Sequence, residues 1–427
     1  MRNFLLAGVA LGAVTAAVAV TPARADDATP PAVFPVTSET DLAGYNGPSL
    51  NGAAPGSVQV NLGGRTFSAI WFQNDPSGTP GWAKSPQPQF MSYFFLYPGF
   101  DYASPSGIHF GANAEIRVTS AIQGGGVGGN ANSPVPWIHQ AQTYVSSAQF
   151  GKVQFGEVSG ALVQNAVATG DDFGSGLFFA WYGTNPYVPW VMGDAVDNYV
   201  TGQKVVYTTP TFSGFLAAIS WQPQPVALNY ADNLASAQAP GSTGLLSKNR
   251  VEIAGKYTGT FSGVGLKADL GYVFADAEPA GGTTVAQSLS YGNAGLELHI
   301  AGFELEGSTS IGKFNPNLTD NGNPDGPLPL GAKDTAAFVV GAGYETGPFK
   351  FGGVFYHVSY DDVDFGGPAG KTGTIAGEGL GASYTVGPGV VGYFDVISAN
   401  FDTVNANTGK FGTQHPFGLG LGTYFTW

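Results

Sequence analysis

The stretch that decides the fold is GIHFGANAEIRVTSAIQ, residues 107–123, in which apolar and polar side chains alternate. One parity carries small or apolar residues, namely Ile108, Phe110, Ala112, Ala114, Ile116, Val118, Ser120 and Ile122. The opposite parity carries mostly polar residues, namely His109, Asn113, Glu115, Arg117, Thr119 and Gln123. Because successive side chains of a strand point to opposite faces, the pattern predicts a strand with one apolar and one polar face. Its length exceeds the roughly 5–6 residues usual in soluble proteins, which favours a strand that crosses a membrane.

A second alternating stretch lies at the C-terminal end of the sequence. Its apolar parity consists of Phe417, Leu419, Leu421, Phe425 and Trp427, while glycine, tyrosine and threonine occupy the other. We therefore expect the chain to finish in a strand whose last aromatic residue lies on the lipid-facing side.

The first 25 residues are typical of a secretory signal peptide. Arg2 provides a positive head, residues 4–20 are apolar, and Ala23–Arg24–Ala25 is a small-residue cleavage site. Cleavage there would remove two arginines and no acids, which takes the formal net charge from −14 to −16. After residue 25 no apolar run reaches the roughly 20 residues of a spanning helix. We therefore expect any membrane crossing to be made by strands.

The composition fits a wall with lipid on one side and water on the other. Charged residues make up 11% of the chain, against about 25% in soluble domains, yet the mean hydropathy is only +0.04. The polarity is therefore mostly uncharged, and a charge facing lipid would cost about 2–4 kcal/mol at the midplane. The acidic balance argues against a nucleic-acid partner and favours cations. With 0 cysteines, the chain cannot use disulfides for stability.

The chain divides into three parts. Residues 1–25 are the predicted signal peptide, 26–56 form a mobile leader rich in Pro, Ala, Thr and Gly, and 57–427 contain alternating segments between turn clusters. We count sixteen segments in eight pairs, with short and long connections in alternation, as in outer-membrane barrels. The predicted fold is all-β, a sixteen-stranded transmembrane antiparallel β-barrel. An alternative for the first segment, 58–72, is a hairpin that turns at Gly63–Gly64.

The longest interruption, 159–202, follows the fifth segment. Its acids are Asp171, Asp172, Asp194 and Asp197, and its aromatic residues are Phe173, Phe178, Phe179, Trp181, Tyr182, Tyr187 and Trp190. So many aromatic residues are costly to leave in water. We expect this third long loop to fold into the barrel mouth and to narrow it.

Other charged residues fall on the polar parity of predicted strands. Glu115 and Arg117 lie two positions apart, so both should point into the lumen, where they would line the passage or pair with each other. Lys256, Lys267 and Asp269 also lie on the polar parity of their predicted strands. The five histidines show no ligand pair at helical or zinc-finger spacing, and no nucleophile has an evident base. We therefore predict no metal site, no cofactor and no enzymatic step.

Three stretches resemble the alphaproteobacterial branch of the general porins of Gram-negative outer membranes. They are LYPGFDYASPSGIHFGANAEIR at 96–117, QTYVSSAQFGKVQFGE at 142–157 and KVVYTTPTFSGF at 204–215. The final Phe425–Thr426–Trp427 is similar to the aromatic signal that the barrel-assembly machinery reads, although Phe is commoner than Trp at the last position. The resemblance spans essentially all of 58–427.

The resemblance implies a homotrimer in the cell outer membrane, in contact with lipid and lipopolysaccharide, with the third loop folded inward as a constriction. It also implies that acids on this loop face bases on the wall. Carried over to this sequence, the loop acids are Asp171, Asp172, Asp194 and Asp197, and the wall bases come from Arg65, Arg117, Lys152, Lys204 and Arg250.

We therefore predict a porin that forms a water-filled channel for passive diffusion of small hydrophilic solutes and ions, with a preference for cations. One alternative is a carbohydrate-selective porin in which the loop aromatics stack against sugars. A second is an outer-membrane enzyme built on a barrel, which would need a Ser or Asp with a His near the rim. A third is a secreted soluble β-sandwich or β-solenoid binding module, which detergent-free solubility would reveal.

Overall fold

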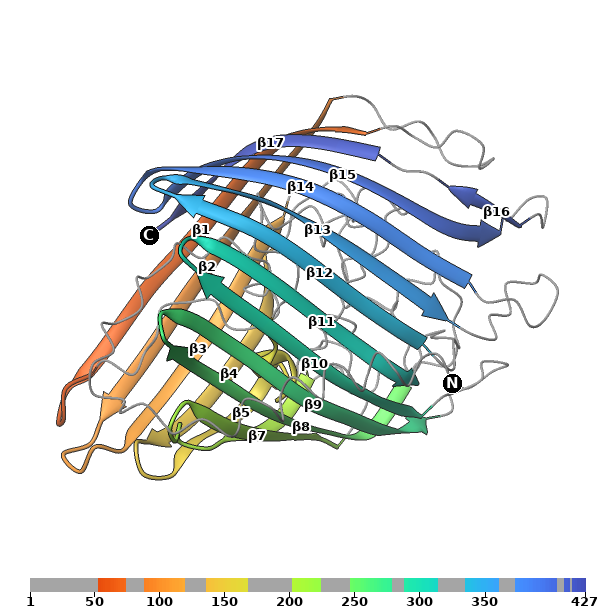
Figure 1. The fold of residues 1–427 in the computed structure, drawn as a ribbon. Coiled ribbons are helices and arrows are strands. Elements are labelled where there is room, and N and C mark those ends of the chain that lie inside the picture. Colours follow the sequence, from red (N-terminus) through yellow and green to blue (C-terminus); the bar gives the residue numbers. More distant parts are fainter. Residues whose placement is uncertain are drawn as a thin grey trace.

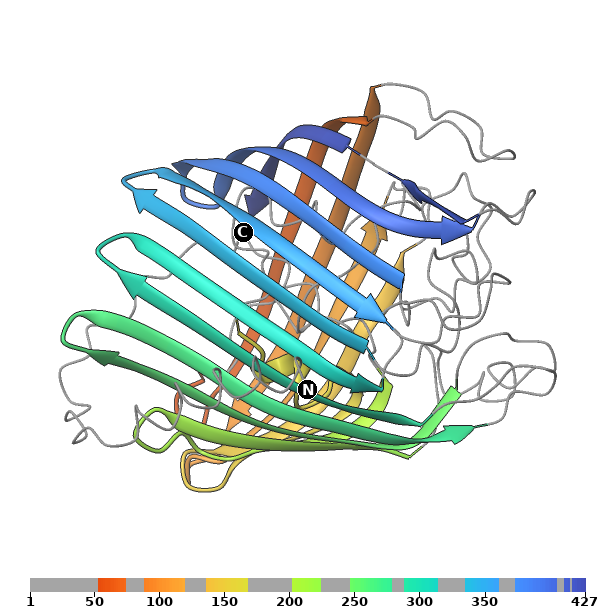
Figure 2. The ribbon, with the colours of Figure 1, turned by 45° about the vertical axis from the view of Figure 1, so that its right-hand side comes forward.

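The structure is a computed structural model that describes ten stretches of the chain, and these form one antiparallel sheet that curves round on itself (Figures 1 and 2). The described residues are 53–73, 88–119, 136–167, 202–223, 246–278, 288–313, 335–360, 373–404, 411–414 and 417–427. No helix in these stretches is long and apolar enough to span a membrane.

The strands follow one another around the wall in sequence order. Their bounds are β1 Val58–Gln73, β2 Gln89–Ala103, β3 His109–Thr119, β4 Trp137–Ser147, β5 Gly151–Val158, β6 Gly202–Thr208, β7 Phe215–Gln222, β8 Leu246–Phe261, β9 Val264–Glu278, β10 Leu289–Ile300, β11 Phe303–Lys313, β12 Thr335–Thr346, β13 Phe349–Tyr360, β14 Gly373–Gly387, β15 Val390–Val404, β16 Phe411–Gln414 and β17 Phe417–Thr426.

The barrel closes between its first and last strands. β1 pairs with β2 on one side and with β17 on the other, with Arg65 opposite Thr426. β16 and β17 pair with successive parts of β15, so together they occupy one position in the wall. The structure is therefore a closed sixteen-stranded antiparallel barrel, which confirms the predicted fold class.

Two details differ from the sequence-based expectations. The alternative hairpin at Gly63–Gly64 is wrong, because β1 continues through both glycines, which pair with Tyr97 and Leu96 of β2. The strand predicted over residues 107–123 begins at His109 and is described as far as Thr119, while positions 120–123 lie outside the described residues.

Tight turns gather at one end of the barrel, on the left in Figure 1. Three of them use two successive residues with positive φ, namely Ser213–Gly214, Ser262–Gly263 and Ala301–Gly302. This backbone conformation matches the right-handed twist of the adjoining strands, and glycine adopts it without steric cost. Each of these turns therefore fixes the register of its hairpin.

The two faces of the sheet differ as the alternation predicts. On β2, Phe90, Phe94 and Phe100 are exposed on the outside, whereas Phe95 and Asp101, on the opposite parity, are buried on the inside. Near the tight turns, outward rings from neighbouring strands meet in pairs. Ring centroids are 4.4 Å apart for Phe215 and Tyr257, 4.6 Å for Phe303 and Tyr344, and 4.7 Å for Phe349 and Tyr384. Such a belt is typical of the membrane interface.

The two faces of β3 provide a direct test of this register. Ile116 lies on the outer face between Leu96 and Ile138, whereas Asn113 lies on the inner face between Gly99 and Gln142. Ile116→Arg should place a charge against lipid at a cost of about 2–4 kcal/mol, so less folded protein should reach the membrane. Asn113→Arg should assemble normally. The measurement is the amount of heat-modifiable protein in the outer membrane, and equal losses from the two variants would contradict the register.

Candidate functional site

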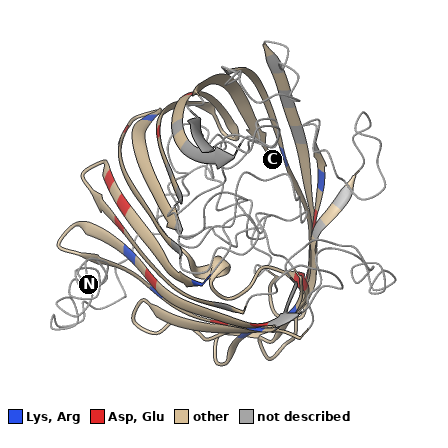
Figure 3. Cartoon of the chain, turned by 90° about the vertical axis from the view of Figure 1, so that its right-hand side faces the viewer, with Lys and Arg blue, Asp and Glu red and all other residues tan. Residues whose placement is uncertain are grey.

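Figure 3 marks the charged positions along the strands of the barrel wall. Because the strand alternation directs polar residues inward, many of these side chains lie on the inner face. The buried charged residues of this face are Arg65, Asp101, Glu115, Arg117, Lys204, Arg250, Glu252, Asp269, Glu297, Glu304, Glu306 and Asp395. Lys152 is half-buried on the inner face of β5. All the wall residues that the sequence analysis singled out are therefore described, and all point inward.

The chain that leaves β5 runs along the inside of the wall. The backbone N–H of Ala161 donates to Ser220 Oγ at 3.0 Å, and that of Leu162 donates to Glu252 Oε2 at 3.0 Å. Further along, the N–H of Val167 donates to Asp269 Oδ1 at 3.0 Å. Since these acceptors lie on β7, β8 and β9 in turn, residues 159–167 cross three neighbouring strands on their inner faces.

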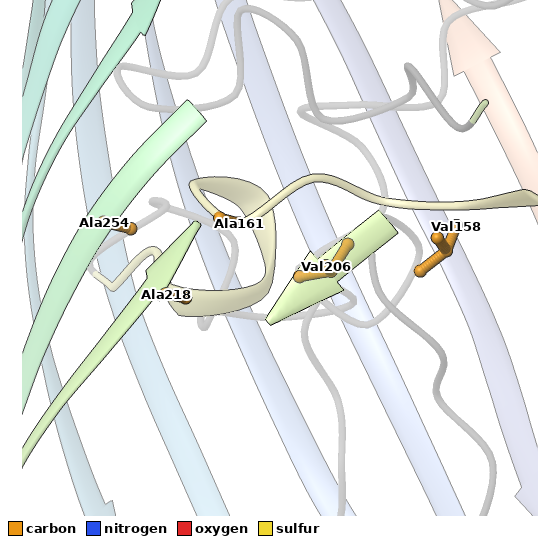
Figure 4. Close-up of a cluster of buried hydrophobic side chains, with 5 residues drawn as sticks. All are labelled: Val158, Ala161, Val206, Ala218 and Ala254. Atoms are coloured by element: carbon orange, nitrogen blue, oxygen red, sulfur yellow. The ribbon is translucent and has the colours of Figure 1, made fainter. Parts of the chain in front are cut away.

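Residues 159–167 pack against small and apolar side chains of the wall. Figure 4 shows the buried cluster, which consists of Val158, Ala161, Val206, Ala218 and Ala254. Nearby, a Cβ at Gly295 of β10 would lie 2.5 Å from the backbone oxygen of Val167, so glycine is needed for this close approach. Within the segment is the short 3-10 helix η2, Val163–Asn165, where the Asn165 side chain donates to Ala161 O at 2.7 Å.

The rest of the interval 159–202 contains Asp171, Asp172, Asp194 and Asp197. These four acids lie outside the described residues. Their place in a constriction therefore stays a prediction, and the described segment supplies only the point where the loop enters the barrel.

Glu252 connects this segment to two bases of the wall. Its Oε1 lies 2.7 Å from Arg250 Nε and 3.6 Å from Lys204 Nζ, while its Oε2 accepts the Leu162 N–H. The three charged side chains are at most 3% exposed. A carboxylate buried this deeply is costly unless it is paired and hydrogen-bonded, and here both oxygens have partners. Among the described side chains of this cluster, one acid thus contacts two bases.

A second cluster lies on β1, β2 and β3. The guanidinium carbons of Arg65 and Arg117 lie 5.1 Å and 4.8 Å from the centroid of the Phe95 ring, a distance typical of cation–π contacts. Arg117 Nε also lies 2.5 Å from Glu115 Oε1. In the strand order, β1 and β9 are half the circumference apart. Arg65 of β1 therefore lies on the side of the barrel opposite to Asp269 of β9, the acceptor of the Val167 N–H.

Lys152 belongs to a third group, close to a tight turn. Its Nζ lies 5.8 Å from the ring centroid of Tyr144, whose hydroxyl donates to Asp101 Oδ1 at 2.7 Å. The other oxygen of Asp101 lies 2.8 Å from His109 Nδ1. The predicted wall bases thus divide into three places, with Arg65 and Arg117 in one, Lys204 and Arg250 in another, and Lys152 in the third.

Sequence reasoning missed Glu252 and Ser220, two of the three residues that hold the start of the loop, and placed the third, Asp269, on the polar face without this contact. Glu252 stands two positions from Arg250, the same spacing that identified Glu115 and Arg117 as lumen residues. That spacing could have found Glu252. Ser220 had no such signal, because only the tertiary structure brings it to Ala161.

The two residues predicted as an assembly signal lie on the outside of the barrel. Phe425 is 45% exposed and Trp427 is 57% exposed. The Trp427 ring contacts Phe94, with centroids 5.6 Å apart, and its backbone exchanges two hydrogen bonds of 3.1 Å with Gly64. Trp427 thus helps to hold β17 to β1, while its role in assembly stays a prediction.

Comparison with known proteins agrees with this architecture. A family model described as Gram-negative porin matches residues 13–404. The chain belongs to this family. Membership identifies it as an outer-membrane porin. No curated protein sequence matches the chain.

Solved structures of similar fold include an outer-membrane protein and two porins. OmpT of Vibrio cholerae, in its trimer form, has a TM-score of 0.54 and 14% identity, over 87% of this chain and 100% of that one. The anion-selective porin from Comamonas acidovorans has a TM-score of 0.52 and 12% identity, over 87% and 100%. A mutant of the Rh. blastica porin has a TM-score of 0.50 and 15% identity, over 86% and 100%. At these identities the likeness concerns the fold alone.

The anchoring role of Glu252 can be tested by Glu252→Ala. The change leaves Arg250 and Lys204 buried with less counter-charge and removes the acceptor of the Leu162 N–H. Breaking a buried ion pair from one side typically costs about 3–5 kcal/mol, so the unfolding temperature of the barrel should fall clearly. The measurement is heat-modifiability on gels, with Asp276→Ala, an exposed acid on the outer face, as control. If both variants unfold at the wild-type temperature, Glu252 does not stabilise this wall.

Proposed function

We propose that this porin is a passive diffusion channel for small hydrophilic solutes and ions, and that it prefers cations. The observation that carries the proposal is the course of residues 159–167, which enter a lumen lined by polar side chains and are held there by hydrogen bonds to three strands. A water-filled path takes its width from whatever narrows it and its selectivity from the charges beside it. The proposal involves no chemical step.

The sign of the selectivity depends on the loop. On the described inner wall, acids and bases are comparable in number once the half-buried Lys152, Lys256, Lys267 and Lys350 are included. Such a wall gives little net preference by itself. The formal net charge of −14 and the four loop acids therefore favour cations. In a narrow passage the lower effective dielectric makes such charges act more strongly than they do at a surface.

The charge preference is tested by replacing Asp171, Asp172, Asp194 and Asp197 together with Asn. The change removes four negative charges with little change in volume, so the reversal potential in a salt gradient should move toward zero. Single-channel conductance in 1 M salt should change little, because the Debye length there is about 3 Å.

Asp276→Asn is the matched control, since it removes a charge from the outer face at the end of β9. Its reversal potential should equal that of wild type. A quadruple variant that also keeps the wild-type reversal potential would place the four acids away from the ion path and would remove the basis for the proposed selectivity.

The proposal also covers the branch of the family, the oligomeric state and the route to the outer membrane. We place the chain in the alphaproteobacterial branch of the family, as a homotrimer in contact with lipid and lipopolysaccharide, exported with a cleaved signal peptide and inserted by the barrel-assembly machinery. The resemblance of residues 96–117, 142–157 and 204–215 supports the branch. The trimeric form of the similar Vibrio cholerae protein supports the oligomer.

A carbohydrate-selective channel is the second candidate, because aromatic rings point inward from the seam of the barrel. Phe67 stacks on Tyr393 with centroids 5.4 Å apart, and Tyr424 lies 5.0 Å from Phe67 and 5.4 Å from Tyr393. The three side chains are at most 5% exposed. They pack against one another and present no free face to a sugar, which favours the general diffusion channel.

A further inference from the structure

Two carboxylates and an imidazole meet on the inner face of the β10–β11 hairpin. Glu297 and His299 are two positions apart on β10, and Glu304 of β11 is the direct partner of His299 across the ladder. The two-residue turn Ala301–Gly302, with φ values of 50° and 85°, joins the two strands and fixes their relative position. One ligand atom from each of the three residues lies within 4.8 Å of the other two.

We propose that Glu297, His299 and Glu304 form a binding site for a divalent transition-metal ion such as Zn²⁺, at the tight-turn end of the lumen. Imidazole nitrogen and carboxylate oxygen are ordinary Zn²⁺ ligands, at about 2.0–2.2 Å from the metal. Ligand atoms around a tetrahedral ion are therefore about 3.4 Å apart. Small side-chain rotations bring the three atoms to that separation, and lumen water completes the coordination.

The site combines fixed ligands with an open side. The carboxylates of Glu297 and Glu304 are 5% and 8% exposed, so the wall holds them in place, whereas the His299 side chain is 37% exposed. Because the His299 side chain is partly exposed, an ion in the lumen can reach the site directly. Imidazole also favours a transition metal over Mg²⁺ or Ca²⁺, which prefer oxygen ligands alone.

Two lysines compete for the same carboxylates. Lys267 Nζ lies 2.6 Å from Glu297 Oε1, and Lys350 Nζ lies 3.1 Å from Glu304 Oε2. Because the Lys267 side chain is 42% exposed, its ammonium can turn into lumen water when an ion binds. Glu306, buried beside the site as the partner of Glu297, adds a third carboxylate, and Lys256 of β8 adds a third ammonium group that interacts with Glu297.

Direct binding to the folded, full-length barrel in detergent tests the site without reference to transport. After treatment with EDTA, the protein is titrated with ZnCl₂ by isothermal calorimetry. Wild type should bind one Zn²⁺ per chain at this site, and His299→Gln should weaken that binding at least about tenfold. His357→Gln, a histidine on the outer face of β13, is the matched control and should bind as wild type does.

Lys267→Met gives a second, opposite prediction. Removing the competing ammonium should lower the Kd for Zn²⁺ by about fivefold, because a partly exposed ion pair contributes a free energy of about that factor. If His299→Gln fails to fold, Glu304→Gln replaces it and should show the same loss. The proposal is overturned if wild type binds no Zn²⁺ at millimolar concentration, or if the ligand variants and His357→Gln bind equally.

Discussion

The structure depends on the hydrogen-bonded ladder that joins β1 to β17. In the hydrocarbon region no water is present to pair with backbone N–H and C=O groups, so an open sheet edge would leave a row of them unsatisfied. Pairing of Arg65 through Gln73 with the last strand removes that edge. The continuation of β1 through Gly63 and Gly64 belongs to the same requirement, because a turn there would shorten the strand on which the closure is built.

Once the ladder is closed, the alternation of side chains along each strand determines which residues face the lumen and which face lipid. Every inward position of the wall is available to polar groups, and several of these hold the chain that leaves β5. Ser220, Glu252 and Asp269 accept backbone hydrogen bonds from residues 161, 162 and 167. The same wall carries the bases Arg250 and Lys204, so anchoring of the loop and charge of the lumen are properties of one set of side chains.

The sequence predicted the strands and their faces well, for a physical reason. Alternation over a long segment is a local signal, so Glu115 and Arg117 could be assigned to the lumen without knowledge of any other strand. The break between β16 and β17 and the exact strand ends were not predictable in this way, since turn-forming residues tolerate shifts of a few positions.

Neighbour relations across the barrel could not be read from the sequence. The grouping of Lys204 with Glu252, and the approach of His299 to Glu304, depend on register and curvature. Lys152 illustrates the limit, because its inward direction was predictable but its place beside Tyr144, away from Lys204, was not. The alternation in the sequence thus predicts to which face each side chain points, whereas its contacts on neighbouring strands are known only from the strand pairing in the structure.

The central claim is that the inner face of the barrel lines a water-filled path while the outer face meets lipid. The chain contains 0 cysteines, so a single introduced cysteine is a unique reporter. Leu266, Lys267 and Ala268 are successive residues of β9, of which Lys267 points inward and is 42% exposed.

Each position is changed to Cys in turn, and single-channel conductance in a planar bilayer is recorded before and after addition of a charged thiol reagent. The account predicts that modification changes the conductance of Lys267→Cys and leaves those of Leu266→Cys and Ala268→Cys unaltered. Equal responses at the three positions, or no channels at all, would contradict it.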